Sequence, residues 1–142
     1  MIAPLKHADL AAAAKIHSES FDTAWPMDSL ETHIGTDLCL GIFEPDLQGF
    51  IIIKSAADQA EIITLAVSPD GRGAGRGYAL VMESCEQLQT RNLSILFLEV
   101  AEDNVAASAL YKKCGFIPIG RRPAYYRRAA GRVAALTYRK DL

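Results

Sequence analysis

The chain has 142 residues and a mass of 15.4 kDa, a length that fits one domain over residues 1–142. Because 50% of the residues are hydrophobic and 23% are charged, a wholly disordered chain is excluded, and no apolar run approaches the ~20 residues that cross a bilayer. The formal net charge of −2 argues against a general nucleic-acid binder, and we expect no secretion signal at the N-terminus.

The first half of the chain predicts two helices followed by a change to strand-like patterns. Apolar residues at helical spacing behind a candidate N-cap, Asp9, predict the longer of the two helices. The expected elements are, in chain order, a strand over residues 1–5, helices over residues 10–21 and 28–34, and strands over residues 38–43, 49–54 and 60–67.

The second half predicts alternating helices and strands. The expected elements are a helix over residues 75–91, a strand over residues 94–100, a helix over residues 104–113, and strands over residues 116–121 and 132–138. The strand over residues 94–100 is almost wholly apolar, which is typical of a strand covered on both faces. The order of elements predicts a mixed α/β sheet in which antiparallel strands come first and a crossover follows.

A glycine-rich loop lies between the predicted strand over residues 60–67 and the predicted helix over residues 75–91. Four of the ten glycines lie in it, at positions 71, 73, 75 and 77. Backbone N–H groups in such a loop, together with the dipole of the following helix, can bind a phosphate group. The alternative is a turn that uses glycine for steric reasons alone.

Two common phosphate-binding motifs do not match this loop. A P-loop requires a lysine at its end, and no lysine lies between Lys54 and Lys112. A dinucleotide-binding loop requires glycine or alanine at its third position, which here is Arg76, Tyr78 or Leu80. Glu99, at the end of the next predicted strand and 22 residues after Gly77, is the one feature that favours a dinucleotide.

The loop pattern Arg72-x-x-Gly75-x-Gly77 resembles the acyl-CoA pyrophosphate loop of the GNAT N-acetyltransferases. A second stretch, Asn104-x-x-Ala107-x-x-Leu110-Tyr111-x-x-x-Gly115-Phe116, resembles the second motif of the same family at the expected distance. The resemblance implies a GNAT-like α/β fold, with a mixed, mostly antiparallel sheet of about seven strands flanked by about four helices. It also implies acetyl-CoA as the cofactor and coenzyme A as the product.

Further segments resemble the RimI family of GNAT enzymes, which acetylate the N-terminal alanine of a small-subunit ribosomal protein. The matching segments are Glu61 to Val67, Leu98 to Asn104, Arg121-Arg122-x-x-Tyr125-Tyr126, and Gly131-Arg132. The likeness is looser before residue 60. Trp25 matches a tryptophan of that family, but Ala24 and Pro26 replace the usual proline and serine beside it, and Gly71 and Gly73 replace bulkier loop residues.

The resemblance assigns the cofactor site residue by residue. Backbone groups of Leu65, Ala66 and Val67 would hold the pantetheine arm, and an N–H near Val67 would polarise the thioester carbonyl. Asn104 and Tyr111 would contact the cofactor arm from the other side. The loop residues that would bind the pyrophosphate are Arg72, Gly73, Ala74, Gly75, Arg76, Gly77 and Tyr78.

The resemblance makes Glu99 the general base and Tyr111 the general acid. Glu99 is the only acid in the apolar run from residue 93 to residue 101, and the alternative is a carboxylate held in an ion pair. Tyr111 lies on the helix after this strand, where the alternative is a core residue. Trp25, Tyr125 and Tyr126 are candidates for lining a peptide groove, and each could equally be a packing residue.

The charge distribution bears on partners. Residues 1–103 hold 16 acids and 6 bases, whereas residues 104–142 hold 1 acid and 9 bases. The acidic part suits a basic N-terminal peptide, as ribosomal proteins have, and the arginine pairs of the basic part could meet phosphates, RNA or only solvent. We expect a cytoplasmic monomer with no specific nucleic-acid or membrane partner. Widely separated cysteines, and histidines without ligand spacing, predict no metal site.

Two other functions stay open at this point. The first is a GNAT enzyme that acetylates a small amine or a lysine side chain, with the same cofactor loop and a different groove. The second is a non-catalytic CoA-binding module that acts as an assembly partner. An open groove would favour the peptide, and a closed acidic pocket would favour the small amine.

Overall fold

The computed structural model describes residues 1–21 and 26–142, and the structural findings below concern these residues. They form a series of strands, α-helices (α) and short 3-10 helices (η). In chain order these are β1 (Ile2–Pro4), η1 (His7–Asp9), α1 (Leu10–Ser20), α2 (Met27–His33), β2 (Leu38–Phe43), β3 (Leu47–Ala56), β4 (Gln59–Val67), η2 (Pro69–Gly71), α3 (Arg76–Thr90), β5 (Ile95–Ala101), α4 (Val105–Lys113), β6 (Ile117–Arg128) and β7 (Gly131–Asp141).

The described strands form one seven-stranded sheet in the order β1-β2-β3-β4-β5-β7-β6. Every neighbouring pair is antiparallel except β4 and β5, which are parallel because α3 connects them as a crossover. The predicted fold class is therefore confirmed, with antiparallel strands first and the crossover after them.

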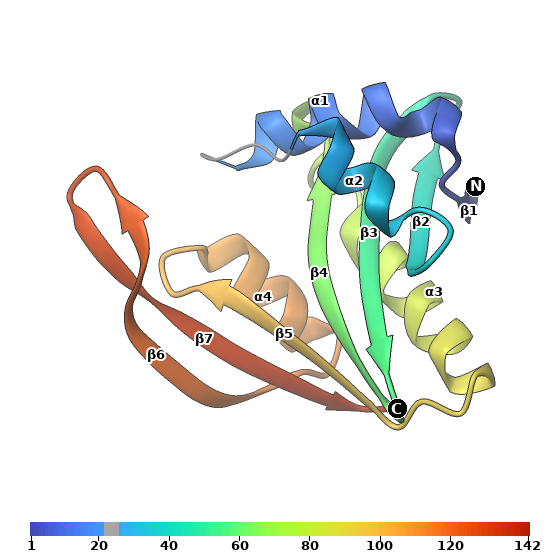
Figure 1. Cartoon of the computed structure of the whole chain (residues 1–142). Coiled ribbons are helices and arrows are strands. Elements are labelled where there is room, and N and C mark those ends of the chain that lie inside the picture. Colours follow the sequence, from blue (N-terminus) through green and yellow to red (C-terminus); the bar gives the residue numbers. More distant parts are fainter. Residues whose placement is uncertain (22–25) are drawn as a thin grey trace.

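Helices cover the two faces of the sheet in pairs. Helices α1 and α2 lie on one face, and α3 and α4 lie on the other (Figure 1). Strand β3 has helices on both faces, so its central residues Phe50 to Ile53 are all buried although successive side chains point to opposite sides. The core thus consists of two apolar layers with the sheet between them.

Strands β4 and β5 separate along their length. They pair only from Gln59 to Ile62 on β4 and from Ile95 to Leu98 on β5. Beyond these pairs the two strands move apart, as Figure 1 shows. The expectation that β5 is covered on both faces is wrong, because Leu96 and Leu98 are buried under α4 whereas Glu99 on the other face is only partly buried.

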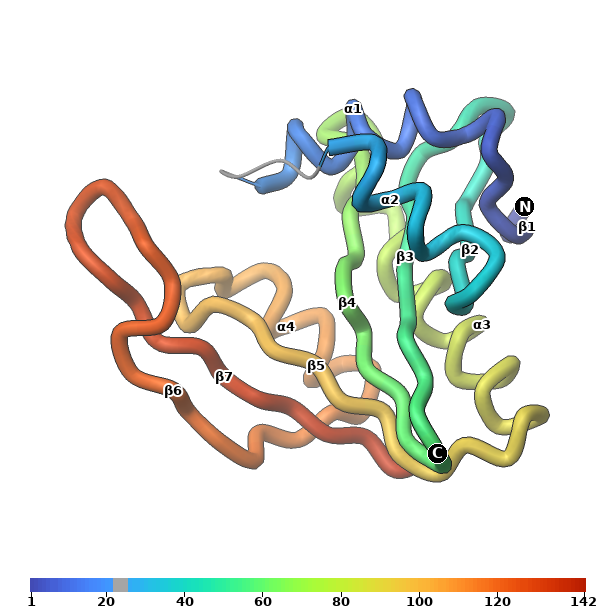
Figure 2. Tube along the Cα trace, viewed as in Figure 1, coloured from blue at the N-terminus to red at the C-terminus, as the bar shows by residue number. Residues whose placement is uncertain are grey.

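Strands β6 and β7 form a longer hairpin than the sequence predicts, and it extends away from the rest of the molecule (Figure 2). The apolar pattern ends near Arg121, but the strand continues to Arg128. This outer strand is largely exposed along its whole length, so no hydrophobic alternation marks it. A register shift lies between Arg122 and Tyr126, where Ala124 has a φ of 52°.

The predicted N-cap of α1 is correct in position but not in its hydrogen bond. Asp9 precedes the helix, yet its carboxylate accepts a hydrogen bond from the N–H of Lys6 at 2.8 Å. The reason is that Asp9 itself ends a 3-10 turn with α-like dihedral angles, so its side chain faces backwards. None of the helices in the described ranges is long and apolar enough to span a membrane.

Candidate active site

A cavity of about 740 Å³ lies where β4 and β5 separate. Its two long walls are β4 from Ile62 to Leu65 and β5 from Leu98 to Ala101. Helix α4 contributes Ala107 and Tyr111, α1 contributes His17 and Ser20, and the hairpin contributes residues 126–128. Side chains distant in the sequence therefore meet around one opening in the sheet.

The inner edge of β4 has free backbone groups beside this cavity. No described strand pairs with that edge after Ile62, so the backbone groups of Leu65 and Val67, which point to this side, meet no strand there. Leu65 lines the cavity, whereas the Ala66 side chain is buried in the core under α1. The backbone groups of Ala66 point toward Phe50 on β3, so of these three predicted cofactor residues Ala66 presents neither its side chain nor its backbone to the cavity.

The glycine loop leads from β4 into α3. Gly73 and Gly75 have φ angles of 81° and 78°, and no heavy atom lies within 4 Å of a Cβ placed on either one. Gly75 is the N-cap of α3, so the first N–H groups of the helix have no intrahelical acceptor. The N-terminal end of the helix dipole and the ammonium of Lys113, 5.0 Å from the Tyr78 ring, add positive potential.

The two arginines of this loop fix its shape through their side chains. Arg72 donates to the carbonyl oxygen of Val67 at 3.1 Å and to Oγ of Ser20 at 3.1 Å. Arg76 donates to the carbonyl oxygen of Gly71 and forms an ion pair with Glu44, each at 2.7 Å. The loop thus presents backbone N–H groups to a ligand while its arginines hold it against the body of the protein.

Asn104 joins the cavity to the start of α4. Its Oδ1 accepts a hydrogen bond from the N–H of Ala107 at 3.1 Å and so caps the helix. Because the oxygen is used in this way, the side-chain nitrogen is the group that Asn104 can offer to a ligand.

Glu99 lies in the cavity wall and is also ion-paired. Its Oε1 is 3.0 Å from Nη2 of Arg122, and 23% of its side chain is exposed. Its Oε2 is buried and has no hydrogen-bond partner among the residues that the structure describes. The two interpretations of Glu99 from the sequence, a site carboxylate and an ion-paired one, therefore hold together.

Tyr111 likewise combines packing with a place at the cavity. Its ring meets Phe116 edge-on, with 5.7 Å between the ring centroids, and the side chain is almost fully buried. Burial raises the pKa of the phenol well above its usual value of 10, so the hydroxyl keeps its proton at neutral pH. A protonated phenol is the form that can donate.

The aromatic residues proposed to line a groove differ in their positions. Tyr126 lines the cavity, and burial followed by the nearby Glu99 charge raises the pKa of its phenol. Tyr125 is 51% exposed and packs edge-on against Tyr126, outside the cavity lining. Trp25 lies outside the described residues.

Sequence reasoning assigned no chemistry to His17, yet its side chain lies in the cavity wall. It is 2% exposed and its ring centroid is 4.5 Å from that of Phe21. Burial lowers the pKa of the imidazole, which favours its neutral form. Its position one residue after Ile16, on the apolar stripe of the predicted helix, was the available signal.

Comparisons with known proteins agree with this geometry. Residues 10–116 match the family model described as Acetyltransferase (GNAT) family. The chain is 33% identical over 140 residues to a [ribosomal protein bS18]-alanine N-acetyltransferase from Salmonella typhimurium, covering 95% of this chain and 93% of that one.

Solved structures show the same fold. A ribosomal-protein-S18-alanine N-acetyltransferase from Escherichia coli superimposes with a TM-score of 0.93 at 29% identity, over 99% of this chain and 92% of the other. A Bacillus anthracis acetyltransferase solved in complex with acetyl coenzyme A has a TM-score of 0.81 at 19% identity, over 100% of this chain and 99% of that chain.

Proposed function

The chain belongs to the GNAT family of acetyltransferases, an acetyl-CoA-dependent family, and we propose that it acetylates the N-terminal α-amine of a protein. The proposed acceptor begins with alanine and is a small-subunit ribosomal protein. The observation that carries this proposal is the similarity to bS18-alanine N-acetyltransferases over nearly the whole of both chains.

The residues around the cavity fit acetyl-CoA. The backbone N–H groups from Gly73 to Tyr78, in the loop and the first turn of α3, can donate hydrogen bonds to the pyrophosphate. The unpaired edge of β4 can form hydrogen bonds with the amide groups of the cofactor arm. The side-chain nitrogen of Asn104 faces the same space from α4. When bound, the cofactor supplies an acetyl group as a reactive thioester, and the N–H near Val67 would polarise its carbonyl.

Glu99 would prepare the attacking amine. An α-ammonium transfers one proton to the Glu99 carboxylate, which leaves a neutral amine and a carboxylic acid. The demand is modest because an α-amino group has a pKa of about 7.7–8.0, whereas a lysine side chain at about 10.4 is harder to deprotonate. This difference favours an N-terminal amine over lysine.

Tyr111 would complete the transfer by giving its proton to the departing thiolate. A thiol has an ordinary pKa of about 8.5 and a phenol one of about 10, so this proton transfer must be assisted by local charge. Burial at the cavity wall raises the pKa of the Tyr111 phenol, which keeps it protonated and increases the need for that assistance.

The charges of the cavity wall weigh against a small cationic amine as the acceptor. Both acids of the described wall, Glu99 and Asp103, are paired with arginines, Arg122 and Arg128. The wall is therefore not the closed acidic pocket that would favour such a substrate. We propose that residues 1–142 act as one domain and as a cytoplasmic monomer, on a basic peptide segment.

Mass spectrometry of a peptide panel with acetyl-CoA tests this proposal. The panel holds Ala-, Ser-, Met- and Gly-starting peptides with basic tails, and N-blocked peptides that carry lysine. Acetylation at the α-amine of the Ala-starting peptide is expected. Acetylation of lysine alone would replace this function with the side-chain alternative, and binding of acetyl-CoA without transfer to any amine would favour the non-catalytic module.

Glu99→Gln tests the proposed base. The change should lower kcat by roughly 100-fold, the lower end of the usual contribution of a general base. Glu102→Gln is a matched control, because Glu102 forms an arginine ion pair of the same 3.0 Å length outside the cavity lining. Equal activity of the two variants would contradict the role of Glu99.

A further inference from the structure

Arg122 reaches Glu99 from two strands away. Glu99 on β5 lies opposite Thr137 on β7, which lies opposite Gly120 on β6. Two pairs further along, and so on the same face, Ala135 on β7 lies opposite Arg122. Residues paired in this way share a face of the sheet, so the Arg122 side chain crosses β7 diagonally to meet the carboxylate.

The residues beneath this crossing are small. Ala135, Thr137 and Gly120 leave no large side chain between the guanidinium and the carboxylate on this face. The guanidinium also lies over the ring of Tyr125, 5.4 Å from the ring centroid. Arg122 is thus supported on one side by an aromatic ring and ends at Glu99.

The ion pair with Arg122 places the two oxygens of Glu99 in different surroundings. Nη2 of Arg122 lies 3.0 Å from Oε1. Oε2 is buried and has no hydrogen-bond partner in the described part of the chain. A carboxylate can rotate about its last bond, which exchanges its oxygens. An ion pair on one oxygen opposes that rotation.

We propose that Arg122 is a positioning residue that holds the Glu99 carboxylate in one orientation at the cavity wall, where it accepts the proton of the acceptor amine. The proposal rests on the proposed role of Glu99 as general base. The proton passes from the ammonium nitrogen to the carboxylate, and the guanidinium keeps its charge throughout.

The pair contributes little to folding because 59% of the Arg122 side chain is exposed. Its effect falls on the orientation of the carboxylate. Glu99 shares this space with other charged or titratable groups of the cavity wall, namely His17 from α1, Asp103 from the loop before α4, Tyr111 from α4, and Tyr126, Arg127 and Arg128 from β6. Arg122 is the one whose ion pair with Glu99 is observed.

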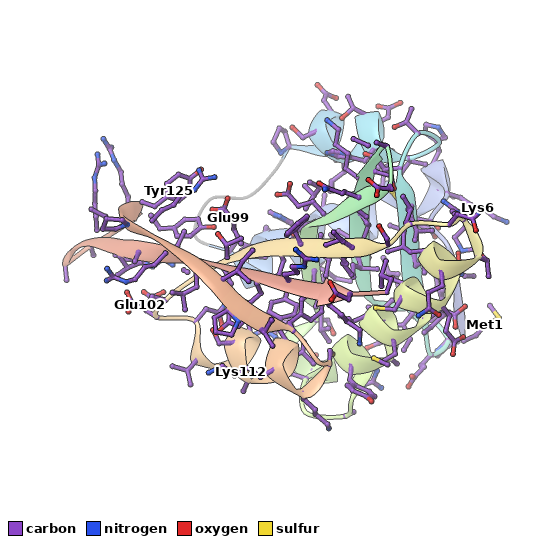
Figure 3. The ribbon with its side chains drawn as sticks, turned by 90° about the horizontal axis from the view of Figure 1, so that it is seen from below. Met1, Lys6, Glu99, Glu102, Lys112 and Tyr125 are labelled. Carbon is purple, nitrogen blue, oxygen red and sulfur yellow. The ribbon has the colours of Figure 1, made fainter. Side chains whose placement is uncertain are left out.

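The test compares Arg122→Met with Arg121→Met. Arg121 is the matched control because it is 56% exposed and pairs with Glu102 at 3.0 Å. Figure 3 shows Glu102 on the opposite side of the hairpin ribbon from Glu99 and Tyr125. The readout is kcat and kcat/KM for the Ala-starting peptide between pH 6 and pH 9, with thermal melting of each variant.

Arg122→Met should lower the plateau of kcat by about tenfold, the scale expected from misplacing a reacting group. KM for the peptide should change little, because the loss lies in the orientation of the base and not in peptide binding. Arg122→Lys keeps the charge but not the planar guanidinium and should restore only part of the plateau. Arg121→Met should match the wild type.

The Glu99→Gln background separates the two proposals. Adding Arg122→Met to Glu99→Gln should cause no further loss, because no carboxylate is left to position. If Glu99→Gln loses activity but Arg122→Met has the wild-type kcat, the positioning role alone is overturned. If Glu99→Gln keeps full activity, both proposals are overturned.

Discussion

Arg128 holds Asp103 with two hydrogen bonds, from Nε to Oδ2 at 2.9 Å and from Nη2 to Oδ1 at 3.1 Å. This bidentate pair joins the far end of β6 to the loop between β5 and α4, and both residues line the cavity. The outer wall of the cavity therefore depends on a contact between segments that are 25 residues apart.

Asp103→Asn should weaken this wall without unfolding the protein. We expect KM for the peptide to rise several-fold while kcat and the melting temperature change little, because the pair is at the surface. Asp141→Asn, which removes a similar arginine pair with Arg139, is the control. An unchanged KM would mean that the pair does not shape the acceptor site.

The pH dependence of the same contact has a definite sign. The hydrogen bond from Arg128 lowers the pKa of Asp103 below its ordinary value of 3.8. A carboxylate with a lowered pKa contributes its stabilisation above the ordinary value and loses it as the pH falls through the folded-state value. An NMR titration of the Asp103 carboxyl should therefore show a midpoint below 3.8, and a midpoint at or above it would contradict the pairing in solution.

Tyr111→Phe should slow the reaction and leave the fold intact. The phenyl ring keeps its edge-on contact with Phe116, so only the proton donor is lost. Since general acids usually contribute about 10²–10⁴-fold, kcat should fall by at least tenfold with little change in KM. Tyr138→Phe, at another buried tyrosine outside the cavity lining, should keep kcat. Similar kcat values for both variants would refute the acid role.

Gly75→Ala should weaken cofactor binding by straining the loop. A non-glycine residue in the left-handed region costs about 1–2 kcal/mol, and Gly75 has a φ of 78° at the N-cap of α3. Gly35, with a φ of 93° and equally open space, lies outside the loop. Both substitutions should lower the melting temperature, but calorimetry should show weaker acetyl-CoA binding only for Gly75→Ala. Equal affinities would argue against the loop as the phosphate site.

His17 should make stability depend on pH. Burial lowers the pKa of its imidazole below 6.5, so the unfolded chain binds a proton more readily than the folded one. Stability is then unaffected above the unfolded pKa and decreases as the pH falls through 6.5. Urea unfolding at pH 7.5 and pH 5.5 should show a larger loss for the wild type than for His17→Gln. Identical losses would exclude His17 as the cause.

Local patterns placed two segments of the candidate site correctly in the fold, and their role in binding acetyl-CoA stays a prediction. The glycine loop ending at Gly77 and the stretch from Asn104 to Tyr111 are contiguous segments whose geometry follows from helix termini and turns. Their neighbours in the fold are also near in the sequence, since one crossover joins β4, α3 and β5. The order of these segments along the chain was therefore enough to predict that they lie near each other in the fold.

The acceptor side depends on contacts that no local pattern contains. The sequence predicts that Arg122 and the neighbouring arginines contact phosphate, RNA or only solvent. In the structure Arg122 lies beside Glu99, because β7 lies between β5 and β6 and brings the two side chains to the same face. The strand around Arg122 is exposed and carries no apolar alternation. The helical pattern places His17 beside Ile16 on the buried side of α1, but it does not show that this side borders a cavity.

The separation of β4 and β5 also bears on how the protein avoids aggregation. Between Ile63 and Val67, the residues of β4 that turn their backbone groups away from β3 meet no described strand on that side. At the rim of a sheet such a segment would recruit strands from other molecules. Here β5, β7 and the hairpin stand on the far side of the opening (Figure 1), so a foreign strand would have to enter between two parts of one sheet. Because the opening lies within the sheet, the unpaired edge of β4 is protected from pairing with strands of other chains.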